Sequence, residues 1–178
     1  VGSFAGCLNG SIINCKSAAK VYGVSSVGGI AGEKGQSMGI CSVLNCEFTG
    51  EVHASENYAG GMIGSGYDGK GTAPNTPVVS IRNCLVSGTI EGKNKLGGIL
   101  GGEPGCENCW ANGSGGVTDN VFCGSIQATE ENATVGAIVG FMKSYNTNQE
   151  VNSNYFLDTC GAINGVGAVE IVHDSDFD

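Results

Sequence analysis

The two histidines, His53 and His173, are the side chains best suited to metal binding or acid–base chemistry. Zinc peptidases place two histidines four residues apart in the motif H-E-x-x-H, so that both reach one ion. That motif is absent from the sequence, and neither histidine has a second one at helical spacing. We therefore predict no metal site and no cofactor, and we expect both histidines on the solvated surface.

Nine cysteines form the second group of potentially reactive side chains. Cys106 and Cys109 make a C-x-x-C pair, but a zinc site needs a second pair and the redox form of the motif needs a helix N-terminus. The glycine-rich surroundings predict a loop, so this pair is expected there, reduced or bridged. Cys15, Cys46 and Cys84 are expected to be buried free thiols that pack as small hydrophobic side chains.

Carboxylates could bind calcium, but the acidic residues do not match the known calcium-binding loop patterns. Asp68 lacks the spacing of an EF-hand loop, and the glycine-rich nonapeptide of calcium-binding β-rolls is absent. Asp174, Asp176 and Asp178 form an acidic end, which is typical of a solvated linker rather than a site.

Overall composition excludes several classes of partner. The net charge is −9 with a single arginine, so the clustered cations that nucleic acids and anionic membranes require are absent. No apolar run is long enough to span a membrane. Charged residues make up only 14% of the chain, whereas Gly is abundant, which suits a structure rich in turns. The chain opens directly in a repeat, so we expect a fragment of a larger protein.

One hexapeptide recurs five times and organises the whole chain. Its copies are VGSFAG, VGGIAG, AGGMIG, LGGILG and VGAIVG, which start at residues 1, 27, 59, 96 and 135. A partial sixth copy, VGAVEI, starts at residue 166. Recurrence of one motif along the whole chain is the signature of a repeat architecture. We therefore predict one domain over 1–178, in which each repeat is one structural unit.

Aligning the repeats produces columns that are almost entirely apolar. The first two columns are Val1, Val27, Ala59, Leu96 and Val135, then Phe4, Ile30, Met62, Ile99 and Ile138. The third to fifth are Ile12, Val43, Ile81, Val117 and Val151, then Ser17, Phe48, Val86, Phe122 and Phe156, then Val21, Val52, Ile90, Ile126 and Cys160. Like positions that stack into one interior would explain this pattern.

A polar column separates the third and fourth apolar columns: Asn14, Asn45, Asn83, Asp119 and Ser153. Asn and Asp tolerate the left-handed backbone, so this column predicts a corner. The next column, Cys15, Cys46, Cys84, Asn120 and Asn154, should then point inward. Together these columns predict an all-β fold, a parallel β-solenoid of about five coils with one coil per repeat. Right-handed winding is expected by analogy with β-helices. Helices do not fit the spacing, whereas an antiparallel sandwich stays open.

The repeated pattern resembles the GLUG-type repeats of bacterial surface proteins, which also flank IgA-specific metallopeptidases. The matching pattern is V-G-G-[IL]-x-G, a spacer, [IV]-x-N-C and then G-x-[VI], clearest over residues 27–52 and 59–90. The resemblance covers residues 1–172, and repeats four and five depart from it where Asn120 and Asn154 replace Cys. It implies an extracellular, cell-surface setting and carries no catalytic residues.

Long insertions fall at one step of each repeat, between the hexapeptide and the third column. Insertions on one edge of a repeat protein often form its binding face. Tyr67, Asp68, Trp110 and Tyr145 lie in these insertions and are the candidate ligand-binding residues, because exposed aromatic rings suit sugars or protein partners. The alternative is that the aromatic side chains fold back over the flank of the core.

These observations together predict a non-catalytic structural or adhesive module. We expect it to be a monomer on a bacterial cell surface, joined to other domains of the same polypeptide, with a host protein or glycan as partner. The alternative is a polysaccharide lyase or hydrolase of the β-helix fold. Such an enzyme needs acids or bases converging in one groove, and no strand inferred from the sequence carries two acids.

Overall fold

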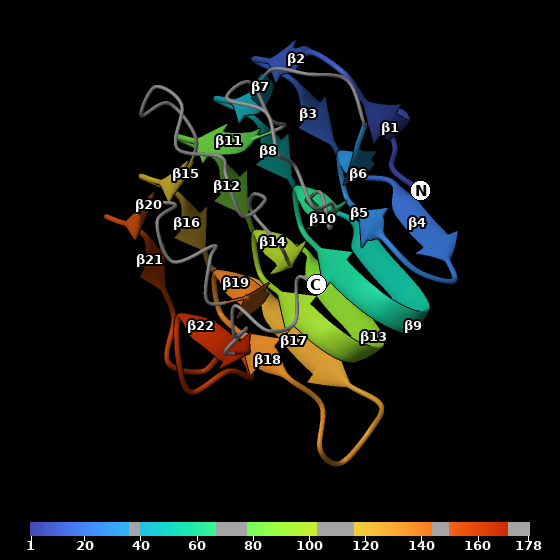
Figure 1. Cartoon of the computed structure of the whole chain (residues 1–178), viewed down its shortest axis with the longest axis vertical. Helices are drawn as coiled ribbons and strands as arrows, with labels where there is room; N and C mark the ends of the chain where they lie inside the picture. The colour runs from blue at the N-terminus through green and yellow to red at the C-terminus, as the bar shows by residue number, and fades with distance from the viewer. Residues whose placement is uncertain (36–39, 67–77, 103–115, 144–149, 171–178) are drawn as a thin grey trace, which may run out of the picture.

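Every regular element of the described chain is a β-strand. The computed structural model describes residues 1–35, 40–66, 78–102, 116–143 and 150–170. Within these ranges there is no helix, and all strand pairings are parallel (Figure 1). The prediction of an all-β fold with parallel strands is therefore confirmed, and an antiparallel sandwich does not describe these strands.

The strands form four sheets, of which the first two follow the hexapeptide and the third apolar column. Sheet 1 contains β1 (Ala5–Leu8), β6 (Ala31–Lys34), β10 (Ile63–Ser65), β14 (Leu100–Gly102), β19 (Val139–Lys143) and β22 (Val166–Glu170). Sheet 2 contains β2 (Ser11–Ile13), β7 (Ile40–Leu44), β11 (Val78–Arg82), β15 (Gly116–Thr118) and β20 (Glu150–Asn152).

The other two sheets carry the fourth and fifth columns. Sheet 3 contains β3 (Lys16–Ser17), β8 (Glu47–Phe48), β12 (Leu85–Val86), β16 (Val121–Phe122) and β21 (Tyr155–Phe156). Sheet 4 contains β4 (Lys20–Gly23), β9 (Glu51–Gly60), β13 (Thr89–Gly97) and β17 (Ser125–Ala128). Two short strands also pair in sheet 4: β5 (Val27–Gly28) with β9, and β18 (Val135–Gly136) with β13.

In the first four repeats the chain visits the sheets in a fixed order, from sheet 1 through sheets 2 and 3 to sheet 4, and then returns to sheet 1 in the next repeat. Equivalent strands of consecutive repeats therefore lie side by side. The register agrees with the columns read from the sequence. In sheet 2, for example, Ile81 pairs with Val43 and with Val117. In sheet 3, Val86 pairs with Phe48 and with Phe122.

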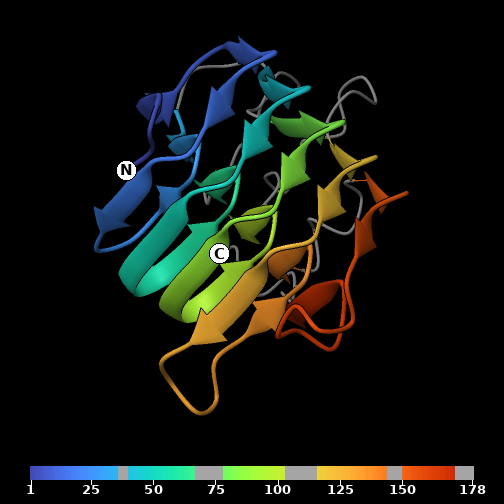
Figure 2. The same ribbon diagram turned by 180° about the vertical axis from the view of Figure 1, so that it is seen from behind.

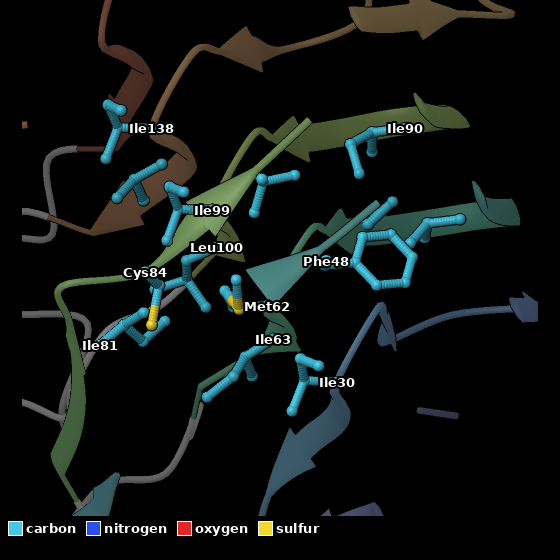
Figure 3. Packing of buried hydrophobic residues seen from close by; sticks show 14 of the residues in the cluster. Ile30, Phe48, Met62, Ile63, Ile81, Cys84, Ile90, Ile99, Leu100 and Ile138 are labelled. Carbon is cyan, nitrogen blue, oxygen red and sulfur yellow. The ribbon is translucent and has the colours of Figure 1, made fainter. Parts of the chain in front are cut away.

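The apolar columns form the core. The largest fully buried side chains include Phe48, Phe122, Ile30, Met62 and Ile99. They gather with their equivalents from the other repeats in a single apolar cluster (Figure 3). Side chains of the columns are less buried at the end of the stack. Phe4, in the first repeat, is 50% exposed, because in the described chain β1 is the edge strand of sheet 1.

Left-handed corners occur where the polar column predicts them. Asn14, Asn45, Asn83, Asp119 and Ser153 all have a positive φ, between 53° and 60°. A left-handed residue turns the chain sharply between sheet 2 and sheet 3, and Asn and Asp adopt this conformation at lower cost than other side chains. A second set of positive φ values, at Ser26, Tyr58 and Lys95, precedes the hexapeptide and was not foreseen.

The hexapeptide glycines allow a second, tighter corner. A Cβ added to Gly28 would lie 1.9 Å from the carbonyl oxygen of Ala31, and one added to Gly97 would lie 1.9 Å from that of Leu100. The following glycine, Gly98, faces the Phe122 ring, where a Cβ would lie 2.5 Å from Cγ. These glycines are therefore required both by the corner and by the packing of the core beneath it.

The sixth copy enters the stack in a different register from the predicted one. Val166 pairs with Val139, whereas alignment of VGAVEI with VGAIVG would pair it with Val135. The predicted alignment is therefore wrong by four residues. The reason is that the chain forms no strand in sheet 4 between β21 and β22, so it returns to sheet 1 by another route.

Candidate functional site

The outer face of sheet 4 carries an open groove of about 440 Å³. Figure 2 shows the strands of this sheet, β4 (blue), β9 (teal), β13 (green) and β17 (orange), side by side. Its lining residues come from β4, β9 and β13, together with Thr129, which directly follows β17. We call it the sheet-4 groove.

One wall of the groove consists of Tyr22, His53 and Glu91. Each of them directly follows a buried residue of the fifth column, so the alternation of a β-strand turns it outward. Tyr22 pairs with His53 and His53 pairs with Glu91 in the parallel register. Three side chains from three repeats therefore stand next to one another in a row.

Tyr22 and His53 stack as parallel rings. Their centroids are 4.6 Å apart and the planes differ by 4°. Tyr22 is 62% exposed, whereas the His53 side chain is only 24% exposed. His53 therefore lies on the outer face, but it is half-buried, because the Tyr22 ring and two carboxylates pack against it.

Two carboxylates flank the His53 imidazole. Glu51 Oε2 lies 3.2 Å from Nε2, and Glu91 Oε2 lies 3.5 Å from Nδ1. Lys20 Nζ lies 2.8 Å from the other oxygen of Glu51. The hydrogen bond from Lys20, followed by the one from His53, lowers the pKa of Glu51, and the same bond to Glu51 raises the pKa of Lys20. Glu51 is thus held in its ionised form.

A second group of charges lies on the neighbouring part of β9 and β13. Lys93 Nζ is 3.0 Å from Glu56 Oε2 and 3.6 Å from Glu130 Oε1. The Glu56 hydrogen bond raises the pKa of Lys93. Strand β9 thus carries two acids, Glu51 and Glu56. The expectation that no strand carries two acids is therefore wrong. The sequence pattern predicted short strands, whereas β9 is ten residues long.

Small residues form the floor of the groove: Gly23, Ala54 and Gly92. A Cβ on Gly92 would lie 2.8 Å from Leu96 Cδ2, so this position admits no larger side chain without displacing its neighbour. Ser55 and Thr129 complete the lining and add hydroxyl groups. The Thr129 hydroxyl donates to the Gly92 carbonyl at 3.3 Å, which fixes its position.

The groove lining combines an exposed aromatic ring, one carboxylate (Glu91), an imidazole and hydroxyl groups. An apolar ring face with a few convergent polar groups is typical of sites for small polar ligands, including sugars. Within the described ranges, no three His, Cys, Asp or Glu side chains are placed to hold a metal ion. The groove is therefore suited to hydrogen bonding and stacking.

The sequence could have pointed to this row of side chains. Its members occupy the position after the fifth column in three successive repeats. They differ in type, however, so no recurrence marks them. Only the parallel register makes them neighbours.

The structure does not describe the candidate residues that the sequence predicted. Tyr67, Asp68, Trp110 and Tyr145 all fall outside the described residues, as do Cys106, Cys109 and His173. The insertions that contain the four candidates connect a strand of sheet 1 with a strand of sheet 2 in each repeat. The strands on the two sides of each insertion therefore belong to the same two sheets in every repeat.

The thiols of the inward column are structural. Cys46 and Cys84 are buried, whereas Cys15 is half-buried because it belongs to the first repeat. Burial raises the pKa of Cys84 to about 12 and that of Cys41 to about 11. A thiol with so high a pKa is a poor nucleophile near neutral pH, because the thiolate is the reactive form.

The described chain contains no helix that could cross a membrane. No protein-family model, curated protein or solved structure matches this sequence. The resemblance to GLUG-type repeats therefore stays a prediction based on the recurring motif.

Proposed function

We propose that this protein is a non-catalytic, glycan-binding module of a bacterial cell-surface protein. We further propose that it winds as a right-handed parallel β-helix of about five coils, one per repeat. The fixed order in which the first four repeats visit the four sheets supports a solenoid with one coil per repeat. The right-handed winding is proposed by analogy with β-helices. The resemblance to GLUG-type repeats supports the extracellular, cell-surface location.

The observation that carries this proposal is the sheet-4 groove with the exposed Tyr22 ring in its wall. A ring that is fixed on one face by His53 loses little conformational entropy when a ligand covers it. The ionised and hydroxyl groups around it can bind the hydroxyl groups of a sugar, while the ring contacts the apolar face. The groove runs across several strands, so it can take more than one sugar unit.

The insertions supply a second proposed surface on the same module. Tyr67, Asp68, Trp110 and Tyr145 stay candidates for contact with a host protein or glycan. We propose that the module is monomeric and is joined to other domains of its polypeptide. In this arrangement the stack of repeats serves as the rigid support for both surfaces.

Tyr22→Ala tests the proposal. We expect it to weaken glycan binding by about tenfold or more while the melting temperature stays nearly unchanged, because Tyr22 is 62% exposed. Tyr155→Ala is the matched control, since Tyr155 is also exposed (70%) but lies in sheet 3. Glycan-array and calorimetric binding measure both. Unchanged affinity in Tyr22→Ala, or a wild type that binds no glycan, would overturn the proposal.

A polysaccharide-active enzyme is the second candidate, and the placement of Glu51 and Glu91 on either side of His53 favours it. A glycosidase needs one carboxyl group that donates a proton and a second that is ionised. Glu51, with its lowered pKa, could fill only the ionised role. Robust turnover of pectin, host glycans or cell-wall polymers, lost in both Glu51→Gln and Glu91→Gln, would favour the enzyme over the module.

A further inference from the structure

We propose that the sheet-4 groove selects sugars that carry a free amino group, and that Glu91 is the carboxylate that binds the ammonium. This inference rests on the proposed glycan-binding function and names its ligand class. It starts from the distribution of charge around the groove, where four glutamates face two lysines: Glu51, Glu56, Glu91 and Glu130, against Lys20 and Lys93.

The two lysines are committed to three of these four carboxylates. Lys20 pairs with Glu51, and Lys93 lies between Glu56 and Glu130. Glu91 is the carboxylate that remains. Among the described residues, its one ion-pair partner is His53, at 3.5 Å, which is longer than a strong charge-assisted hydrogen bond. A ligand cation can therefore bind Glu91 without displacing a lysine.

Glu91 is also placed where a ligand would lie. It belongs to the groove wall, and its side chain is 41% exposed. The neighbouring His53 and Tyr22 rings provide the stacked surface beside it. A sugar ring resting on this surface could direct an amino substituent to the Glu91 carboxylate, and the exposed face of Tyr22 would favour the cation further.

The same charges disfavour acidic sugars. A uronate in the groove would bring its carboxylate close to Glu91, and it would meet the field of a chain with net charge −9. Like charges that face one another in a site act against the wrong ligand. The groove should therefore rank amino sugars above neutral sugars and neutral sugars above uronates.

Three oligosaccharide probes of equal length test this ranking by calorimetry: β-1,4-linked hexamers of glucosamine and of N-acetylglucosamine, and a hexamer of galacturonic acid. The first two share a backbone and differ at the nitrogen, which is a charged ammonium in one and an uncharged acetamide in the other. At a pH where the amine is protonated, we expect the wild type to bind the glucosamine hexamer about tenfold more tightly than the acetylated one. This preference should shrink as salt increases.

Glu91→Gln should remove the preference for the charged hexamer and keep the affinity for the acetylated one. Glu47→Gln is the matched control, because Glu47 is a carboxylate of sheet 3 that pairs with Lys16 and its loss changes the net charge equally. It should keep the preference. Tyr22→Ala should weaken binding of both hexamers, and that of the charged hexamer somewhat more, because its cation–π contact is lost as well.

The possible outcomes separate the two proposals. A preference that survives in Glu91→Gln, or a wild type that prefers the acetylated or the acidic hexamer, would overturn the selectivity. If binding depends on Tyr22 but ignores the amino group, the glycan-binding function stands and only the selectivity fails. A wild type that binds no glycan would overturn both.

Discussion

The side chain of Asn120 makes the same two hydrogen bonds to the backbone that the Cys84 thiol makes one repeat earlier. Its Oδ1 accepts from the backbone N–H of Cys84 at 3.0 Å, as Cys84 Sγ accepts from that of Cys46 at 3.5 Å. Its Nδ2 donates to the Ile81 carbonyl at 2.9 Å, as the Cys84 thiol donates to that of Val43 at 3.4 Å. Cys and Asn share this column because each supplies one donor and one acceptor in a buried place.

Asn120→Ala should lower the free energy of unfolding by about 2–3 kcal/mol, because a buried N–H and a buried carbonyl lose their partners. Asn120→Cys should cost less, about 1 kcal/mol, because a thiol can restore both bonds more weakly. Denaturant unfolding measures both, with the exposed Asn132→Ala as the control. Equal losses in the two variants would contradict the shared role of thiol and amide.

The stability of the protein should fall in alkaline solution. Burial raises the pKa of Cys84 to about 12, whereas an unfolded thiol has a pKa of about 8.5. Between these values the unfolded chain loses the proton and the folded chain keeps it, so the free energy of unfolding decreases as pH rises through this range. The contribution is fully present below about pH 8.5.

Cys84→Val should make this decline shallower by up to about 1.4 kcal/mol per pH unit. Urea denaturation at a series of pH values from about 8 to 10.5 measures the slope. Cys123→Val is the control, because the Cys123 thiol is exposed. A variant slope equal to that of the wild type would show that the Cys84 thiol titrates as it does in the unfolded chain.

The carboxyl group of Glu51 should titrate below the usual value for glutamate, because Lys20 and then His53 donate hydrogen bonds to it. Lys20→Met should raise the pKa of Glu51 back toward about 4.3. Carbon NMR of the side-chain carboxyl measures the change. Lys16→Met, which removes the equivalent lysine of sheet 3, should leave the pKa of Glu51 unchanged. An equal shift of this pKa in Lys16→Met would contradict a local effect of Lys20.

The left-handed corner at Asn83 should not tolerate alanine. Its φ is 53°, where alanine is strained and glycine is not. Asn83→Ala should cost about 1–2 kcal/mol, whereas Asn83→Gly should change the stability by less than about 0.5 kcal/mol. Thermal and denaturant unfolding measure both variants. A glycine variant as unstable as the alanine variant would assign the role to the side chain rather than to the backbone.

The glycine of the tight corner should be irreplaceable. In Gly97→Ala the new Cβ would meet the Leu100 carbonyl oxygen, so the backbone must move, and we expect a loss of more than about 3 kcal/mol or failure to fold. Gly10→Ala is the control, because no atom lies within 4 Å of its added Cβ. Soluble yield and unfolding free energy separate the two. A stable Gly97→Ala protein would contradict the corner geometry.

The recurring positions of this fold could be predicted from the sequence alone. Val43, Ile81 and Val117 recur at one place in three repeats, and the structure pairs them in parallel register. The polar column predicted the corner at Asn83. These features are local to each repeat and recur with it, so every repeat carries the same signal for burial and turning.

The tertiary structure decided what lies between repeats and on the outer face. Tyr22, His53 and Glu91 differ in type, so no column marks them, and they become one wall only because parallel register places three repeats side by side. The register of Val166 was likewise decided by the route of the chain after β21. The interior must be filled in every repeat, so apolar residues recur at the inward positions. The outward side chains are free to differ between repeats. What site they form depends on which side chains the stacking of repeats places beside them.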